Sequence, residues 1–221
     1  MEHLNRRITR VEVVLDVICA ASYVGYVRLR RAIERVRADG GEVEVVFRPF
    51  QLAPDAGFTG EPLLEVLAER FGGHVVAETE QAAADAVHDG VTLDYGRALA
   101  ADTFEAHRLI ASAAARGLAE PMVERLFRAH FTDGLNIAEV PVLDRLAAET
   151  GVTANDASAA ELHAELARVR TRGIGSVPRI SVNDGPSLIG AQPEKTYETA
   201  LRSSGTLSVI PGGVGPGQPG V

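Results

Sequence analysis

The stretch Asp16-Val17-Ile18-Cys19-Ala20-Ala21-Ser22 decides how this 221-residue chain is interpreted. It ends an apolar run, residues 11–17, that is typical of a buried strand, and it leads into residues 23–38, whose apolar spacing predicts a helix. Cys19, the single cysteine, therefore falls at or just before a helix N-terminus. Such positions favour an anion and lower the pKa of a thiol, although the nearby carboxylate of Asp16 acts against this. The alternative is that Cys19 is a small buried hydrophobic residue.

The composition is that of a globular protein and argues against nucleic acid and membrane partners. Hydrophobic residues make up 46% of the chain, and the net charge is -8, whereas nucleic-acid binders are usually basic. No apolar run approaches the roughly 20 residues that span a bilayer. The charged N-terminus is not typical of a signal peptide, and a single cysteine cannot form an internal disulfide. Both features favour the cytoplasm.

The predicted elements at the two ends of the chain belong to one small sheet. Residues 42–47 alternate as a second strand after the helix, which gives a βαβ unit. Strand character returns only at residues 179–183, followed by a short partner strand at residues 187–189 and a final helix at residues 193–202. Between these ends, residues 61–172 are predicted to be helical throughout.

This order predicts an α/β fold in which a helical block is inserted into a sheet domain. The sheet domain is expected to comprise residues 9–60 and 173–203, and the inserted all-helical domain residues 61–172. The Gly- and Pro-rich residues 204–221 are predicted to form a disordered tail.

Charged side chains away from Cys19 predict no further site. The arginines of the first helix are interpreted as a solvated basic face rather than an anion site, and they are Arg28, Arg30, Arg31, Arg35 and Arg37. The histidines at positions 74, 88, 130 and 163 show no pairing at metal-ligand spacing. We therefore predict no metal.

Several stretches along the chain resemble the thioredoxin superfamily, and more closely the FrnE-like branch of the DsbA family. This branch is related to chromene-carboxylate isomerases and kappa-class glutathione transferases. The resemblance implies a thioredoxin-like fold with the helical insertion, and it covers nearly the whole chain apart from both tails. The stretches that carry it are Asp16-Val17-Ile18-Cys19, Tyr23-Val24-Gly25, Arg48-Pro49-Phe50-Gln51-Leu52, Ala106-His107-Arg108-Leu109-Ile110, Val177-Pro178 and Gly190-Ala191-Gln192-Pro193.

The chain departs from the family at the motif itself. The family's usual motif is Cys-Pro-Trp-Cys, whereas this chain has Cys19-Ala20-Ala21-Ser22. The second cysteine of the family resolves a mixed disulfide, and Ser22 cannot do so. Cys19 can still attack a disulfide or add reversibly to an electrophile. Ser22 is interpreted either as a hydrogen-bond donor to the thiolate or as an ordinary serine at a helix start.

The resemblance also implies a set of residues around Cys19. It predicts that the Val177–Pro178 bond is cis and faces the thiol, with the Val177 backbone pairing with an extended substrate; the dipeptide alone is equally typical of a strand start. Phe50 and Gln51 are expected to contact substrate on the same grounds.

Two further residues carry open interpretations. His107 is either a proton carrier that faces the cleft or a surface or core residue. Relatives that bind glutathione have an acidic residue beside the position of Gln192, and Ala191-Gln192 lacks it. Gln192 and free N–H groups could still bind a carboxylate.

Three functions follow as hypotheses. The first is a DsbA-like thiol oxidoreductase with Cys19 as sole nucleophile, acting on a thiol or disulfide substrate and resolved by a low-molecular-weight thiol as co-substrate. The second is a thiol-assisted isomerase or transferase for a small aromatic or polyketide-like molecule, since FrnE-like proteins are associated with polyketide pathways. The third is a redox-inactive binding or scaffold protein. No tightly bound cofactor is expected, and a homodimer is left open.

Overall fold

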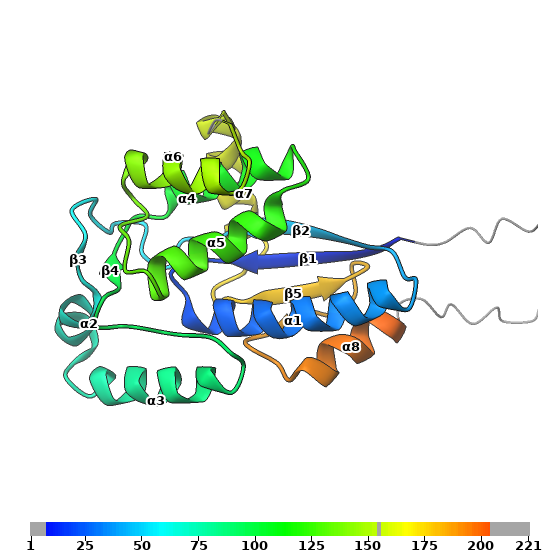
Figure 1. Cartoon of the computed structure of the whole chain (residues 1–221), viewed down its shortest axis with the longest axis horizontal. Coiled ribbons are helices and arrows are strands. Elements are labelled where there is room, and N and C mark those ends of the chain that lie inside the picture. The colour runs from blue at the N-terminus through cyan, green and yellow to red at the C-terminus, as the bar shows by residue number, and fades with distance from the viewer. Residues whose placement is uncertain (1–7, 154–155, 204–221) are drawn as a thin grey trace, which may run out of the picture.

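The computed structural model describes residues 8–153 and 156–203, and it has a mixed sheet with helices on both sides (Figure 1). None of the helices in these ranges is long and apolar enough to cross a membrane. The strands are β1 (Thr9–Leu15), β2 (Val43–Pro49), β3 (Glu61–Pro62), β4 (Leu99–Ala100), β5 (Arg179–Val182) and β6 (Leu188–Ile189). The helices are α1 (Ala20–Ala38), α2 (Leu63–Phe71), α3 (Val75–Val87), α4 (Phe104–Ala114), α5 (Ala119–Phe131), α6 (Val140–Glu149), α7 (Ala159–Thr171) and α8 (Glu194–Ser203).

Both ends of the chain contribute to a four-stranded sheet of order β2-β1-β5-β6. Strand β1 pairs parallel with β2, with Val13 opposite Phe47, and antiparallel with β5, with Val13 opposite Ile180. The βαβ and ββα units therefore share one sheet although α2 to α7 separate them in the sequence. This confirms the predicted α/β fold with a helical insertion.

One detail of the insertion was not predicted. Strands β3 and β4 form a small antiparallel pair, with Glu61 opposite Ala100, and residues 92–98 contain no helix. The expectation that residues 61–172 are helical throughout is wrong at these positions. Two-residue strands are too short to show an alternating pattern. The exact domain boundaries stay predictions, and the predicted tail, residues 204–221, lies outside the described residues.

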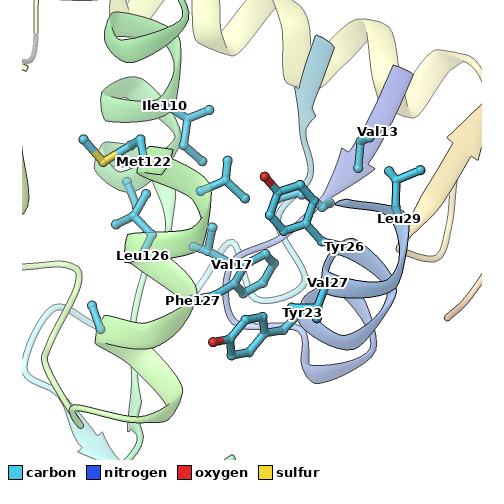
Figure 2. Close-up of a cluster of buried hydrophobic side chains, with 14 of the residues drawn as sticks. Val13, Val17, Tyr23, Tyr26, Val27, Leu29, Ile110, Met122, Leu126 and Phe127 are labelled. Carbon is cyan, nitrogen blue, oxygen red and sulfur yellow. The ribbon is translucent and has the colours of Figure 1, made fainter. Parts of the chain in front are cut away.

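A continuous core joins the sheet to the helical insertion (Figure 2). Side chains of β1 and α1 pack against those of α4 and α5, and the Tyr23 and Phe127 rings stack with centroids 4.7 Å apart. Tyr26 is buried, and its hydroxyl donates to the Glu120 carbonyl at 3.3 Å. The insertion is therefore packed onto α1.

The arginines of α1 are partly exposed, as the sequence interpretation expects, but acidic side chains compensate their charge. Each has a carboxylate partner, and most of these come from distant parts of the chain. The closest contacts are Arg28–Asp89 at 2.7 Å, Arg30–Glu124 at 3.4 Å, Arg31–Asp89 at 3.8 Å, Arg35–Glu194 and Arg37–Glu120 at 2.7 Å. These pairs link α1 to α8, to α5 and to the segment after α3.

Candidate functional site

Cys19 is the N-cap of α1, as its position after a strand predicts. Its backbone is extended, with φ -95° and ψ 112°, and its Sγ accepts a hydrogen bond from the Ser22 N–H at 3.4 Å. The residue is partly exposed. The thiol therefore lies at the free N–H groups of the helix N-terminus.

The Val177–Pro178 segment lies directly against this thiol. The Val177–Pro178 bond is cis, and the Cys19 Sγ lies 3.7 Å from the Val177 carbonyl oxygen, to which the thiol donates. Helix α1 approaches this segment closely because it has a glycine at position 25. A Cβ placed on Gly25 would lie 3.1 Å from the Pro178 Cγ and 3.4 Å from the Tyr197 hydroxyl.

The expected lowering of the thiol pKa is wrong. Burial raises the pKa of Cys19 above its ordinary value, and the negative charge of Asp16 adds to the rise. The hydroxyl and the N–H of Ser22 oppose it without reversing it. The reason is the surroundings of Cys19, which packs against an apolar cluster formed by Val14, Val169, Ile174 and Val177. The helix N-terminus is as predicted, but desolvation of the thiolate is the larger effect.

Ser22 is close to the thiol and has an unusual environment. The side chain is buried, and among the described residues its Oγ makes no hydrogen bond that meets the usual geometry. Its hydroxyl nevertheless lowers the pKa of Cys19. Both interpretations of Ser22 therefore remain, since the residue begins the helix and also acts on the thiol.

His107 lies behind the site and not in its opening. The ring is buried, and its Nε2 lies 2.9 Å from the Phe50 carbonyl oxygen and 3.4 Å from the Asp16 Oδ1. Phe50 itself packs against the apolar cluster that contacts Cys19. His107 therefore positions the backbone of Phe50, in keeping with the interpretation as a core residue.

The side-chain amides of Gln51 and Gln192 are already engaged. Gln51 Nε2 donates to Asp102 Oδ2 at 3.3 Å, and Gln192 Nε2 donates to the Ile189 carbonyl at 2.6 Å. The backbone N–H of Gln192 donates to the Tyr197 hydroxyl at 3.0 Å. Binding of a carboxylate by Gln192 and the free N–H groups beside it stays a prediction.

Two residues that sequence analysis did not place interact with this region, Tyr95 with Cys19 and His130 with Asp16. Tyr95, from the segment between α3 and β4, has its pKa raised to about 12 by burial and by the charge of Cys19. His130 on α5 is fully buried, and burial lowers its pKa to about 4 while Asp16 opposes the shift. Among the described residues, neither ring nitrogen of His130 has a hydrogen-bond partner. No local pattern marks either residue, because each reaches the site through packing of the insertion.

Comparisons with known proteins agree with this geometry. Residues 10–202 match the family model described as a DSBA-like thioredoxin domain. A probable DsbA oxidoreductase from Streptomyces coelicolor is 26% identical, with a TM-score of 0.79, over 96% of this chain and 100% of that chain. The cytosolic disulfide reductase DsbM from Pseudomonas aeruginosa is 22% identical, with a TM-score of 0.55, over 89% of this chain and 95% of that chain.

A 2-hydroxychromene-2-carboxylate isomerase shares the fold, with 14% identity and a TM-score of 0.60 over 88% of this chain and 95% of that chain. A comparison with curated protein sequences gave no match.

Proposed function

The chain belongs to the DsbA-like thioredoxin domain family, and we propose that it is a thiol oxidoreductase with Cys19 as its single nucleophile. The observation that carries the proposal is the position of the Cys19 Sγ, which contacts both the Ser22 N–H and the Val177 carbonyl. A disulfide that reaches this thiol meets a helix N-terminus on one side and the cis-proline segment on the other.

The chemistry is a two-step disulfide exchange. The Cys19 thiolate attacks one sulfur of the substrate, so that a new S–S bond forms, the substrate S–S bond breaks and the second sulfur leaves as a thiolate. Because Ser22 supplies no thiol, a low-molecular-weight thiol must then attack the substrate sulfur of the mixed disulfide. Cys19 leaves as a thiolate in that step, and the sum is an exchange between substrate and external thiol.

The raised pKa of Cys19 has two consequences for this exchange. At neutral pH little of the thiol is ionised, so the attack is slow and accelerates as the pH rises. A thiol of high pKa is also a poor leaving group, so the mixed disulfide persists once it has formed. The protein should hold a disulfide partner as a mixed disulfide rather than release it rapidly in the reduced form.

Trapping tests the proposal. Wild type is exposed to hydroxyethyl disulfide above neutral pH, and the intact mass is measured before and after a low-molecular-weight thiol is added. We expect one adduct on wild type, none on Cys19→Ser, and release at a rate proportional to the added thiol at low concentration. Ser22→Cys should shorten the lifetime of the adduct, because it restores a resolving sulfur.

If wild type forms no adduct where a free cysteine peptide reacts completely, the proposal fails and a binding or scaffold role is preferred. The cytoplasmic location, the homodimer and the link to polyketide pathways stay predictions.

A further inference from the structure

Asp16, which precedes Cys19 in the turn between β1 and α1, carries a buried carboxylate. Asp16 is fully buried, and its carbonyl accepts the Cys19 N–H at 3.1 Å in the turn between β1 and α1. One carboxylate oxygen, Oδ2, accepts the Leu52 N–H at 2.8 Å. The other, Oδ1, lies 3.4 Å from the His107 Nε2 and makes no hydrogen bond within the described residues. The Nε2 hydrogen of His107 is directed to the shorter contact, the Phe50 carbonyl at 2.9 Å.

Most cations of the neighbouring elements are held on other carboxylates. On α1 the arginines begin at Arg28, which is paired with Asp89. Arg48 on β2 and Arg172 after α7 both contact Glu12. Arg179, which follows Pro178, forms no ion pair with a carboxylate among the described residues, and its charge is opposite in sign to that of a carboxylate at Asp16.

The thiol therefore works in an apolar setting next to the residue that carries this carboxylate. The Coulomb energy between charges grows as the effective dielectric constant falls, and salt screens buried charges weakly. An anionic reactant approaching Cys19 is repelled by Asp16 as well as by the thiolate itself. A neutral reactant is not repelled, and it also matches the apolar cluster around Cys19.

We infer that Asp16 is a specificity-determining residue that restricts Cys19 to uncharged or cationic disulfides and disfavours anionic ones. This inference rests on the proposed function, and it extends to the external thiol that releases the adduct. Anionic thiols of the glutathione type are then poor partners, and small uncharged thiols and disulfides are the preferred class.

The test uses disulfides of similar size and different charge: hydroxyethyl disulfide, which is neutral, dithiodiglycolate, which is anionic, and cystamine, which is cationic. Second-order rates of adduct formation at Cys19 are divided by those of a neutral reference thiol, N-acetylcysteine amide. We expect wild type to disfavour dithiodiglycolate against hydroxyethyl disulfide on the order of tenfold, the size of one weakly screened charge. In Asp16→Asn the normalised rates with hydroxyethyl disulfide and dithiodiglycolate should agree to within about twofold.

A matched control separates Asp16 from the overall negative charge of the chain. Glu44→Gln removes one exposed carboxylate on β2, where it lies opposite Arg10 at the far end of the sheet, and it should leave the ratio unchanged. Raising the salt concentration to about 1 M, where the Debye length is about 3 Å, should leave most of the preference in wild type.

The possible failures are distinguishable. Equal normalised rates for the three disulfides overturn the inference and leave the proposed function standing, whereas no adduct with any of them overturns the proposed function. A preference that disappears at high salt, or that Glu44→Gln removes, belongs to surface charge and overturns the role of Asp16. If circular dichroism shows that Asp16→Asn is unfolded, the salt series on wild type tests the inference. A preference that persists at about 1 M salt supports a buried charge, and one that disappears overturns the role of Asp16.

Discussion

At its N-terminus α1 presents a thiol beside a buried carboxylate, whereas from Arg28 onward it carries arginines that contact carboxylates. The first region leaves polar atoms of Asp16 and Ser22 without hydrogen bonds among the described residues. The second region pairs its guanidinium groups with carboxylates, as in Arg28–Asp89, although Arg30 Nε also makes no hydrogen bond there. The difference separates two tasks along one helix, since the charge pairs link α1 to the insertion and α8 while the other end presents the reactive sulfur.

The largest effect that should sharpen this comparison is acid destabilisation at the thiol end. Burial lowers the pKa of His130 from 6.5 to about 4. The unfolded chain therefore binds this proton more tightly than the folded chain. The free energy of unfolding should fall by about 3 kcal/mol as the pH is lowered from 6.5 to 4, and this group should not change it above pH 6.5. His130→Leu should remove this pH dependence from the free energy of unfolding measured with urea. His163→Leu, at an exposed position, should keep it, and an unchanged slope in His130→Leu would contradict the assignment.

A second prediction concerns the close approach of α1 to the cis-proline segment. Gly25→Val should destabilise the protein by roughly 1–3 kcal/mol, because its side chain would overlap Pro178 and the Tyr197 hydroxyl. Chemical denaturation measures the loss. Ala38→Val, at the exposed end of the same helix, should cost only the small difference in helix propensity. Equal stability of Gly25→Val and Ala38→Val would mean that the segment can move aside.

At the arginine end, Asp89→Asn should cost about 1–2 kcal/mol, because it removes a carboxylate that accepts from Arg28 at 2.8 and 2.7 Å. Both side chains are largely shielded, with 27% and 12% exposed, so solvent screens the pair only in part. Asp39→Asn, at the C-cap of α1, removes an exposed partner of Arg202 on α8 and should change stability too little to measure. The alkylation rate of Cys19 should be the same in both variants. A changed rate in Asp89→Asn would show that the two ends of α1 are coupled.

Local sequence was sufficient to place Cys19 at the start of α1 and to predict the strands of the sheet, because hydrophobic periodicity and helix capping act between neighbouring residues. It was not sufficient for the partners of the arginines, since Asp89, in the segment after α3, is far from Arg28 in the sequence and reaches it only in the folded chain. The same limit explains why the sequence predicted the wrong direction for the pKa shift of Cys19. A helix N-terminus can be predicted from sequence, but desolvation by Val169 and Val177 depends on how the insertion and β5 close over Cys19.

The smallest predicted effect is the most specific, because stability and reactivity should change in opposite directions at Ser22. The Ser22 hydroxyl lowers the pKa of Cys19, so Ser22→Ala should raise that pKa further and slow alkylation by iodoacetamide roughly threefold near neutral pH. The same hydroxyl is buried and lacks a hydrogen bond of the usual geometry among the described residues, so its removal should leave stability unchanged or raise it by up to about 1 kcal/mol.

Ser22→Thr keeps a hydroxyl and should recover part of the rate, which a purely structural role would not require. The measurement is the alkylation rate of each protein against pH, together with its urea midpoint. Coincident pH–rate profiles for wild type and Ser22→Ala would contradict a role for the hydroxyl. A slower and less stable Ser22→Ala would instead mean that the serine supports the fold of the α1 start, and that the thiol responds to that fold rather than to the hydroxyl.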